Sequence, residues 1–181
     1  MKRLLLALLA VAGTAAAQNT NDTRDVTANT RSKDWESRNT EETQVVLPAL
    51  PKNENLIEFW VSNSTAFRFF IDTASLLVDR EGVVRYTLVA RSQSGVANIS
   101  YEGMRCSAAT YKIYAYERDG RWSPTTSEWR AIEPNAIQRW HNELRYRYFC
   151  VERRGALLSR EEGLDALRRG GHPGAAARGG Y

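Results

Sequence analysis

The clearest pattern in the chain is an alternation of two sets of positions between Val83 and Arg91. One set is apolar and the other is mostly polar: Val84, Tyr86 and Leu88 against Arg85, Thr87 and Arg91. A period of two residues, rich in β-branched and aromatic side chains, predicts a strand that is buried on its apolar side. Because an unpaired arginine is costly inside a protein, the Arg85 side is expected to be wetter.

Shorter strands and turns surround this segment. Strands are predicted over residues 67–72, 75–78 and 96–104, with turns over residues 79–82 and 92–95. Gly82 and Gly95 supply the positive φ that tight connections need. Connections this short join antiparallel neighbours, so the segment predicts a four-stranded antiparallel meander.

The rest of the chain adds further strands and two helices. Strands are predicted over 56–61 and 110–118, and Asp119-Gly120 is a strong hairpin signal that leads to a return strand at 121–123. A short helix is predicted over 135–147, followed by an extended segment at 148–151. Ser159 and Glu162 have the spacing of a capping box, and Gly170 stands where that second helix would end. We therefore expect an α+β fold, mainly an antiparallel β-sheet meander with one or two short C-terminal helices and one disulfide.

The N-terminus has the pattern of an export signal. Met1-Lys2-Arg3 is basic, residues 4–11 are apolar, and Ala15-Ala16-Ala17 fits the small-residue cleavage rule. The apolar run is too short to cross a bilayer as a stable anchor. Residues 1–17 are therefore predicted to be a signal peptide, and the mature protein is expected in the periplasm with no membrane span.

The composition after residue 17 changes twice along the chain. Residues 18–42 are polar, with Trp35 as their only large apolar side chain, and are predicted to be a disordered linker. Residues 43–170 are predicted to form a single β-rich domain, whose first part (43–51) lies extended over it, and residues 171–181 a disordered tail. The formal net charge of +4 becomes +2 without Lys2 and Arg3, which implies no nucleic-acid partner.

The chain has two cysteines, Cys106 and Cys150. An even count in an exported protein predicts a disulfide between them. It would close a loop of roughly 45 residues, and the chain-entropy model gives such a bridge about 4 kcal/mol.

Most catalytic signatures are missing from the sequence. Of two histidines, His141 falls on the predicted helix and His172 in the predicted tail, and no ligand spacing predicts a metal site. The chain has no nucleophile elbow and no phosphate-binding glycine loop. We therefore expect neither a metal nor a cofactor.

Polar residues at strand ends are the first candidate site. Asp72 and Glu102 could do acid–base chemistry, although strand ends usually carry polar residues that bond turns. The structural hypothesis is an ion pair between Glu102 and either Arg85 or Arg91. Arg105 stands three residues from Glu102, across a glycine at which the chain can turn.

Aromatic side chains are the second candidate. Those predicted to share an exposed surface are Tyr114, Tyr116, Trp122 and Trp129. Tyr114 and Tyr116 fall on the strand face opposite Ile113, so some of this aromatic area could bind a partner, although aromatic residues also build cores.

The sequence resembles the cryptic neisserial protein-like family of small exported bacterial proteins, whose function is uncharacterised. The matching segments are Asp34-Trp35-Glu36, LPALPKNENLIEF (47–59), FIDTASL (70–76), GVVRYTLVARS (82–92), NISYEGMRC (98–106), YKIYA (111–115), Trp129-Arg130, YFC (148–150) and the predicted helix of residues 159–170. The resemblance implies a periplasmic protein and supplies no catalytic residue.

Two classes of function remain open on the sequence alone. The first is a non-enzymatic binding or envelope-accessory module, with an envelope protein or a glycan as its partner. The second is a small periplasmic hydrolase that uses Asp72 or Glu102 in an aromatic-lined cleft.

Overall fold

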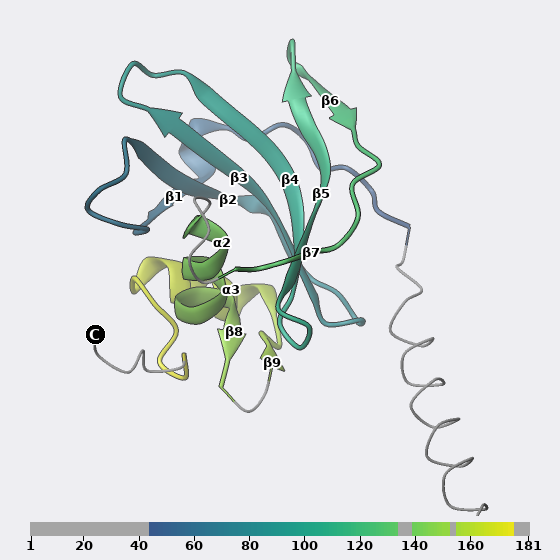
Figure 1. Ribbon diagram of the computed structural model, residues 1–181, viewed down its shortest axis with the longest axis vertical. Helices are drawn as coiled ribbons and strands as arrows, with labels where there is room; N and C mark the ends of the chain where they lie inside the picture. The colour runs from purple at the N-terminus through teal and green to yellow at the C-terminus, as the bar shows by residue number, and fades with distance from the viewer. Residues whose placement is uncertain (1–43, 134–138, 153–154, 176–181) are drawn as a thin grey trace, which may run out of the picture. The chain divides into compact units, whose positions relative to one another are not determined.

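Six strands that follow one another along the chain form an antiparallel meander, which is the main layer of the structure (Figure 1). The computed structural model describes residues 44–133, 139–152 and 155–175. The strands of the meander are β1 (Leu56–Phe59), β2 (Phe67–Val78), β3 (Val83–Ser92), β4 (Ala97–Arg105), β5 (Thr110–Arg118) and β6 (Arg121–Pro124). A short seventh strand, β7 (Arg130–Ala131), also pairs with β5, and β8 (Cys150–Val151) and β9 (Gly155–Ala156) form a separate hairpin.

Apart from one 3-10 turn, the helices come after the meander in the sequence. A single 3-10 turn, η1 (Asn53–Asn55), precedes β1, and α2 (Arg139–Glu143) continues into a π-helix, η2 (Leu144–Phe149). The last helix, α3 (Arg160–Arg168), begins as its capping box predicts, because Oγ of Ser159 accepts from the backbone N–H of Glu162 at 3.2 Å. The predicted α+β fold with a mainly antiparallel sheet is confirmed.

Strand β2 differs in one detail from the predicted meander. The two strands expected at 67–72 and 75–78 are one continuous strand, whose register against β3 shifts between Asp72 and Leu77. At the irregularity, Oγ of Ser75 donates to the carbonyl oxygen of Asp72 and accepts from the N–H of Thr87. These two hydrogen bonds supply partners for backbone groups that would be unpaired where the β2–β3 hydrogen bonding is interrupted. The strand can therefore bend without ending.

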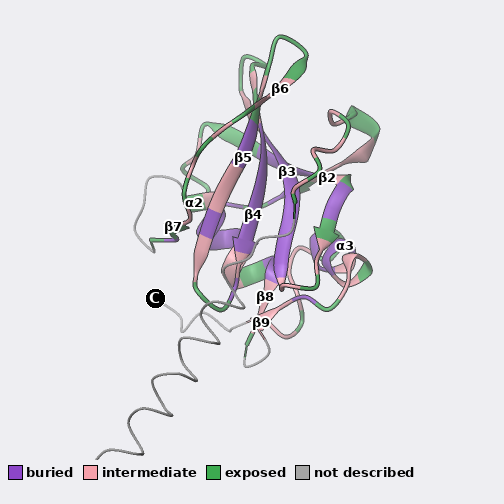
Figure 2. Cartoon of the chain, turned by 90° about the vertical axis from the view of Figure 1, so that its right-hand side faces the viewer, coloured by how far each residue is buried: buried purple, intermediate pink, exposed green. Residues whose placement is uncertain are grey.

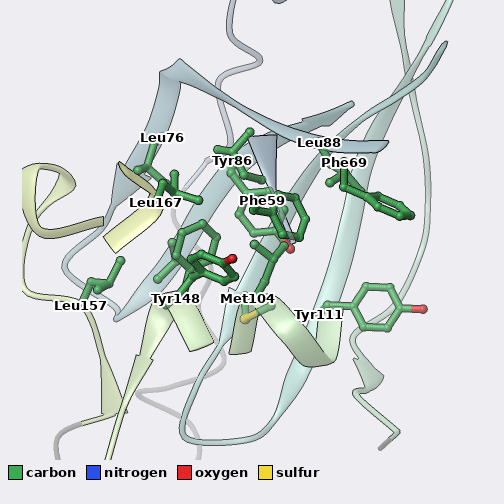
Figure 3. Packing of buried hydrophobic residues seen from close by; sticks show 14 of the residues in the cluster. Phe59, Phe69, Leu76, Tyr86, Leu88, Met104, Tyr111, Tyr148, Leu157 and Leu167 are labelled. Atoms are coloured by element: carbon green, nitrogen blue, oxygen red, sulfur yellow. The ribbon is translucent and has the colours of Figure 1, made fainter. Parts of the chain in front are cut away.

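The main core lies between one face of the sheet and the helices (Figure 3). The pairing register places Val84, Tyr86 and Leu88 of β3 on this face, as predicted. Two of the aromatic side chains of η2, Tyr148 and Phe149, pack onto it, and the ring centroid of Phe149 lies 5.3 Å from that of Tyr86. We call this the helix-covered face.

The opposite face of β3 is also buried, which corrects the expectation of a wetter side. Arg85 is 4% exposed and Thr87 0% exposed, and Figure 2 shows the centre of the sheet buried along β3 and β4. Residues 44–52 run extended on this side, where the indole N–H of Trp122 donates to the carbonyl oxygen of Pro48 at 2.7 Å. Because both faces are covered, the polar residues of the alternation need internal partners.

A disulfide joins the end of the meander to the segment that follows η2. The Sγ atoms of Cys106 and Cys150 are bonded, and their Cα atoms lie 5.4 Å apart. This confirms the predicted pairing, and it ties β4 to the π-helix that covers the core.

The predicted signal peptide and linker lie outside the described residues. The described residues all belong to one compact unit. Beyond Gly170 the chain continues to Ala175 along η2 and β8: the N–H of His172 donates to the carbonyl oxygen of Arg147 at 2.7 Å, and Ala175 bridges to Val151. Within the ranges given above, no helix is long and apolar enough to cross a membrane.

Candidate functional site

Glu102 is the polar residue at the centre of the helix-covered face. It lies opposite Tyr86 in the β3–β4 register, flanked on the same face by Ser100 and Met104. Its side chain is 2% exposed. Burial of a carboxylate is costly unless its oxygens are hydrogen-bonded, and here two side chains supply those bonds.

The first partner of Glu102 is His141 of α2. Its Nε2 atom lies 2.8 Å from Oε2 of Glu102, and the imidazole is 2% exposed. When the carboxylate is ionised it can only accept a hydrogen bond, and the donor of the pair is then the N–H at Nε2 of the imidazole. The ring of Tyr111 stacks on the imidazole with centroids 3.7 Å apart, which fixes the plane of the ring.

The second partner of Glu102 is Ser100, whose Oγ donates to Oε1 at 2.6 Å. The hydroxyl of Tyr86 is also buried beside this carboxylate. Burial, and secondarily the interaction with Glu102, raise the pKa of Tyr86 well above its ordinary value. Four side chains from β3, β4 and α2 therefore form one buried polar cluster inside an apolar core.

A pocket of about 180 Å³ opens on this cluster. Its walls are mostly apolar and its polar lining includes Glu102 and His141; the lining consists of Phe67, Phe69, Leu88, Ala90, Asn98, Ser100, Glu102, Ile113, Tyr116, Trp140 and His141. Phe67 and Tyr116 are 38% and 39% exposed, so they stand at the mouth. We call this the Glu102 pocket.

Tyr116 reaches the pocket because β5 is irregular. The β4–β5 register shifts between Tyr101 and Glu102, which leaves Tyr114 as an extra residue on β5. An extra residue reverses the alternation beyond it. Tyr116 therefore shares the pocket with Ile113, although strict alternation predicts opposite faces for them.

The predicted aromatic surface is divided between the two faces of the sheet. Tyr114 is buried near Arg85 and Tyr101, and Trp122 packs against the same Tyr101. Trp129 lies under the guanidinium of Arg105, 4.1 Å from its ring centroid. Of the four predicted aromatic residues, only Tyr116 lines the Glu102 pocket.

The predicted polar residues are likewise separated. Asp72 pairs with Thr87 in the register, whereas Glu102 pairs with Tyr86, so the two carboxylates point to opposite faces. Asp72 is buried, and its Oδ1 accepts from the N–H of Ala74 at 3.3 Å. It therefore belongs to the bend of β2 and not to a site shared with Glu102.

The ion pair expected between Glu102 and Arg85 or Arg91 is wrong, for the same geometric reason. Arg85 lies opposite Gly103, so its guanidinium points away from Glu102 and pairs with Asp79 instead. Arg91 lies at the other end of β3, where its Nη2 donates to Oδ1 of Asn53 at 2.9 Å. A one-residue step along a strand changes the face, and this step decides the partner.

The order of the hydrogen bonds limits the chemistry of the cluster. In a nucleophilic triad the histidine stands between the hydroxyl and the carboxylate. Here the carboxylate of Glu102 stands between Ser100 and His141, so the imidazole does not contact the hydroxyl. The cluster can hold a proton or accept a hydrogen bond from a ligand, but it does not activate Ser100.

A metal centre is not assembled by the described part of the chain. No group of three or more His, Cys, Asp or Glu side chains there could hold a metal ion. His172, the other histidine, hydrogen-bonds Oε1 of Glu162 at 2.9 Å.

Sequence reasoning missed His141, Trp140 and the phenylalanines of the pocket as site residues. The sequence contained one indication of this site. Ser100 and Glu102 stand at positions where the strand pattern predicts buried side chains, and His141 falls among apolar residues of the predicted helix. Polar residues at core positions need partners, so this pattern favours a pairing between them.

The comparisons with known proteins identify a family and nothing finer. The family model for the CNP1-like family matches residues 34–168. No curated protein and no solved structure matches the chain. The matched residues extend from before β1 to the end of α3 and include every residue of the Glu102 pocket. The chain belongs to the CNP1-like family.

Proposed function

We propose that this protein is an exported, non-enzymatic binding module, which takes one apolar side chain of an envelope protein partner into the Glu102 pocket. The observation that carries the proposal is the pocket itself: apolar walls, an exposed aromatic mouth and a buried hydrogen-bonded carboxylate. Concave apolar sites with a few fixed polar groups are the usual form of a binding site.

The volume of the pocket favours a single group over a whole ligand. Sites for free small molecules have volumes of about 300–1,000 Å³, whereas this pocket has about 180 Å³. A cavity of about 150 Å³ is enough to hold one benzene ring. The pocket therefore fits one aromatic or branched aliphatic side chain that belongs to a larger partner.

The lining favours a protein side chain over a sugar. Phe67, Phe69, Leu88 and Trp140 offer apolar surface, whereas a sugar ring would need partners for several hydroxyl groups. At the polar end, each oxygen of Glu102 receives one bond and has room to accept another. An aromatic side chain with an N–H or O–H group would satisfy both parts.

Two features support export to the periplasm. Residues 1–17 have the order of a signal peptide, and the Cys106–Cys150 disulfide belongs to the kind of bond that persists in oxidising compartments. Intact-mass measurement of periplasmic material should show the loss of residues 1–17. Recovery of the full-length chain from the cytoplasm, under conditions in which secretion works, would refute export.

A hydrolase that uses Glu102 is the second candidate. The observation in its favour is the Glu102–His141 pair inside an aromatic-lined pocket. Against it stand the order of the hydrogen bonds and the position of Asp72, which lies on the opposite face of the sheet from Glu102. Turnover of ester, glycoside or peptide substrates that is lost in Glu102→Gln, with the fold intact, would favour the enzyme.

Titration with single-ring probes tests the binding proposal. Toluene, p-cresol and indole should shift the NMR signals of His141 and of the Trp140 indole, and p-cresol and indole should bind more tightly than toluene. Ala90→Leu should abolish the shifts, because Ala90 lines the pocket and a larger side chain fills it.

Ala97→Leu is the matched control for this titration. Ala97 pairs with Arg91 and lies on the opposite face of the sheet, one residue from Asn98 of the pocket. The control should bind the probes as the unchanged protein does. Absence of any shift with all three probes, or equal binding by Ala90→Leu, would contradict the proposal.

A further inference from the structure

A separate cleft of about 500 Å³ lies between η2 and the turn that follows α3. Its lining is polar and aromatic, and it consists of Trp60, Glu143, Tyr146, Arg147, Arg169, Gly170, Gly171, His172 and Ala175. We call it the Arg147 cleft. No residue lines both this cleft and the Glu102 pocket, so the two are independent sites.

Arg147 is an exposed residue that the surrounding chain holds in one orientation. Its Nε donates to the carbonyl oxygen of Gly170 at 2.7 Å, and its own carbonyl oxygen accepts from the N–H of His172 at 2.7 Å. Its guanidinium lies over the indole of Trp60, 5.4 Å from the ring centroid. An exposed arginine normally loses conformational freedom when it binds a ligand, and these contacts have already restricted it.

The terminal nitrogens of Arg147 have no hydrogen-bond or ion-pair partner among the described residues. Two terminal N–H groups in a planar fork match the paired oxygens of a carboxylate or a phosphate. The guanidinium of Arg147, which is held in one orientation at the cleft, therefore supplies one side of a preformed anion-binding site.

Arg169 supplies a second positive charge in the same cleft. Its Nε donates to Oδ1 of Asp165 at 2.8 Å, and the two side chains are 68% and 50% exposed. An exposed pair of this kind stabilises the fold little and is screened by solvent. Arg169 can therefore exchange Asp165 for a ligand at small cost.

Glu143 limits where an anion can lie. This carboxylate also lines the cleft, but it is buried and has interactions within the protein. Like charges repel, so an anion is disfavoured at the inner end of the cleft and favoured at the rim. The rim carries Arg147 and Arg169, which are both exposed.

We infer that the Arg147 cleft binds the phosphate or carboxylate group of an anionic ligand between Arg147 and Arg169. The inference does not depend on the Glu102 pocket. Arg147 makes the bidentate contact, Trp60 keeps its guanidinium in place, and Arg169 adds charge. The same chemistry serves a soluble anion and a lipid headgroup.

Titration with inorganic phosphate and citrate is the test for a soluble anion. Both should shift the NMR signals of the Trp60 indole and of Nε–H of Arg147. Arg147→Gln should weaken binding by about tenfold or more, since a charge-assisted bidentate contact is lost. The affinity of Arg147→Lys for these anions should lie between that of the unchanged protein and that of Arg147→Gln, because lysine keeps the positive charge but lacks the planar pair of N–H donors.

Arg168→Gln is the matched control, because Arg168 is exposed on the same helix and does not line the cleft. It removes the same charge and should leave binding unchanged. Co-sedimentation with phosphatidylcholine vesicles, with and without phosphatidylglycerol, is the second arm. Anion-dependent binding in either arm that Arg147→Gln removes supports the inference and identifies the source of the anion. Absence of binding in both arms, or an equal loss in Arg168→Gln, overturns it.

Discussion

The Nε2 atom of His141 lies 2.8 Å from Oε2 of Glu102, and both side chains are almost completely buried between the sheet and α2. The pair joins a strand in the middle of the sheet to a helix that comes 39 residues later. It is at once a structural contact between the sheet and α2 and the polar end of the Glu102 pocket.

Glu102→Gln should therefore destabilise the protein, by about 1–3 kcal/mol. The amide keeps the shape of the side chain but replaces one acceptor oxygen by an N–H₂ group, which leaves a buried donor or acceptor unsatisfied beside Ser100 or His141. Thermal and urea unfolding monitored by circular dichroism measure the change. Glu152→Gln, at an exposed position, is the control, and an unchanged melting curve for Glu102→Gln would contradict the structural role.

Arg85 should matter for stability on the other face of the sheet. Its guanidinium pairs with the carboxylate of Asp79 and lies over the ring of Tyr114, 5.7 Å from the centroid. Arg85→Met leaves Asp79 without this charge and should cost about 3 kcal/mol of unfolding free energy. Urea unfolding is the measurement.

Asp79→Asn provides the double-mutant test of that pair. Asp79 also accepts from the N–H groups of Glu81 and Val83 through Oδ1, a role that asparagine can keep. The double variant Arg85→Met/Asp79→Asn should be destabilised by less than the sum of the two single variants. Strict additivity would show that the two side chains do not interact.

The Cys106–Cys150 bridge should contribute strongly to stability. The cysteines are 44 residues apart, and chain entropy gives a closed loop of this size about 4 kcal/mol. Replacement of both cysteines by alanine should lower the melting temperature substantially, and reduction by dithiothreitol should have the same effect on the unchanged protein. Peptide mapping without reductant should recover the two cysteine peptides linked; two free thiols in periplasmic material would refute the bridge.

Gly103→Ala should destabilise the sheet, although alanine is readily accommodated by the backbone of most strand positions. A Cβ atom at this position would stand 2.5 Å from the hydroxyl oxygen of Tyr114, so the packed ring would have to move. Overpacking of this kind costs about 1–3 kcal/mol. If the Tyr114 ring is the cause, Tyr114→Leu should cost less in the Gly103→Ala background than in the unchanged protein, whereas equal costs would exclude it.

Alkaline pH should destabilise the protein through Tyr86. Its pKa is raised well above the ordinary value of about 10, first by burial and then by Glu102. Above pH of about 10 the unfolded chain releases this proton and the folded chain keeps it, so the free energy of unfolding falls as pH rises.

Tyr86→Phe isolates this contribution. It removes the titrating group, and the free energy of unfolding of the variant should therefore fall less steeply between pH of about 9 and 11. Burial also raises the pKa of Tyr101, Tyr116 and Tyr148, so a smaller slope should remain. An identical slope in Tyr86→Phe would show that Tyr86 ionises normally in the folded protein.

The local sequence pattern predicted the meander well, because strands joined by short turns can hardly pair in any way other than as antiparallel neighbours. The turns at residues 79–82 and 92–95 and the Asp119-Gly120 hairpin all join antiparallel neighbours. The backbone N–H of Gly82 donates to the carbonyl oxygen of Asp79, and that of Gly95 to the carbonyl oxygen of Ser92. Two cysteines likewise allow one pairing.

The site was harder to predict because it depends on which face each side chain occupies. Arg85 of β3 lies opposite Gly103, whereas Glu102 of β4 lies opposite Tyr86, so the two side chains point to opposite sides of the sheet. Glu102 therefore meets His141, and Arg85 meets Asp79. The extra residue in β5 then brings Tyr116 to the pocket and sends Tyr114 away from it. Neither the cross-strand register nor a single extra residue is visible in the alternation of one strand.

The sequence by itself determined the turns at residues 79–82, 92–95 and 119–120, the capped last helix, the cysteine pair and the apolar face of β3, because these depend on neighbours along the chain. The tertiary structure decided that the other face of β3 is also covered, and so that Arg85 and Thr87 are buried. It also decided that Glu102 and His141, 39 residues apart, form one buried pair. Burial and long-range pairing depend on how separate segments pack together, and the pattern of a single segment does not contain that information.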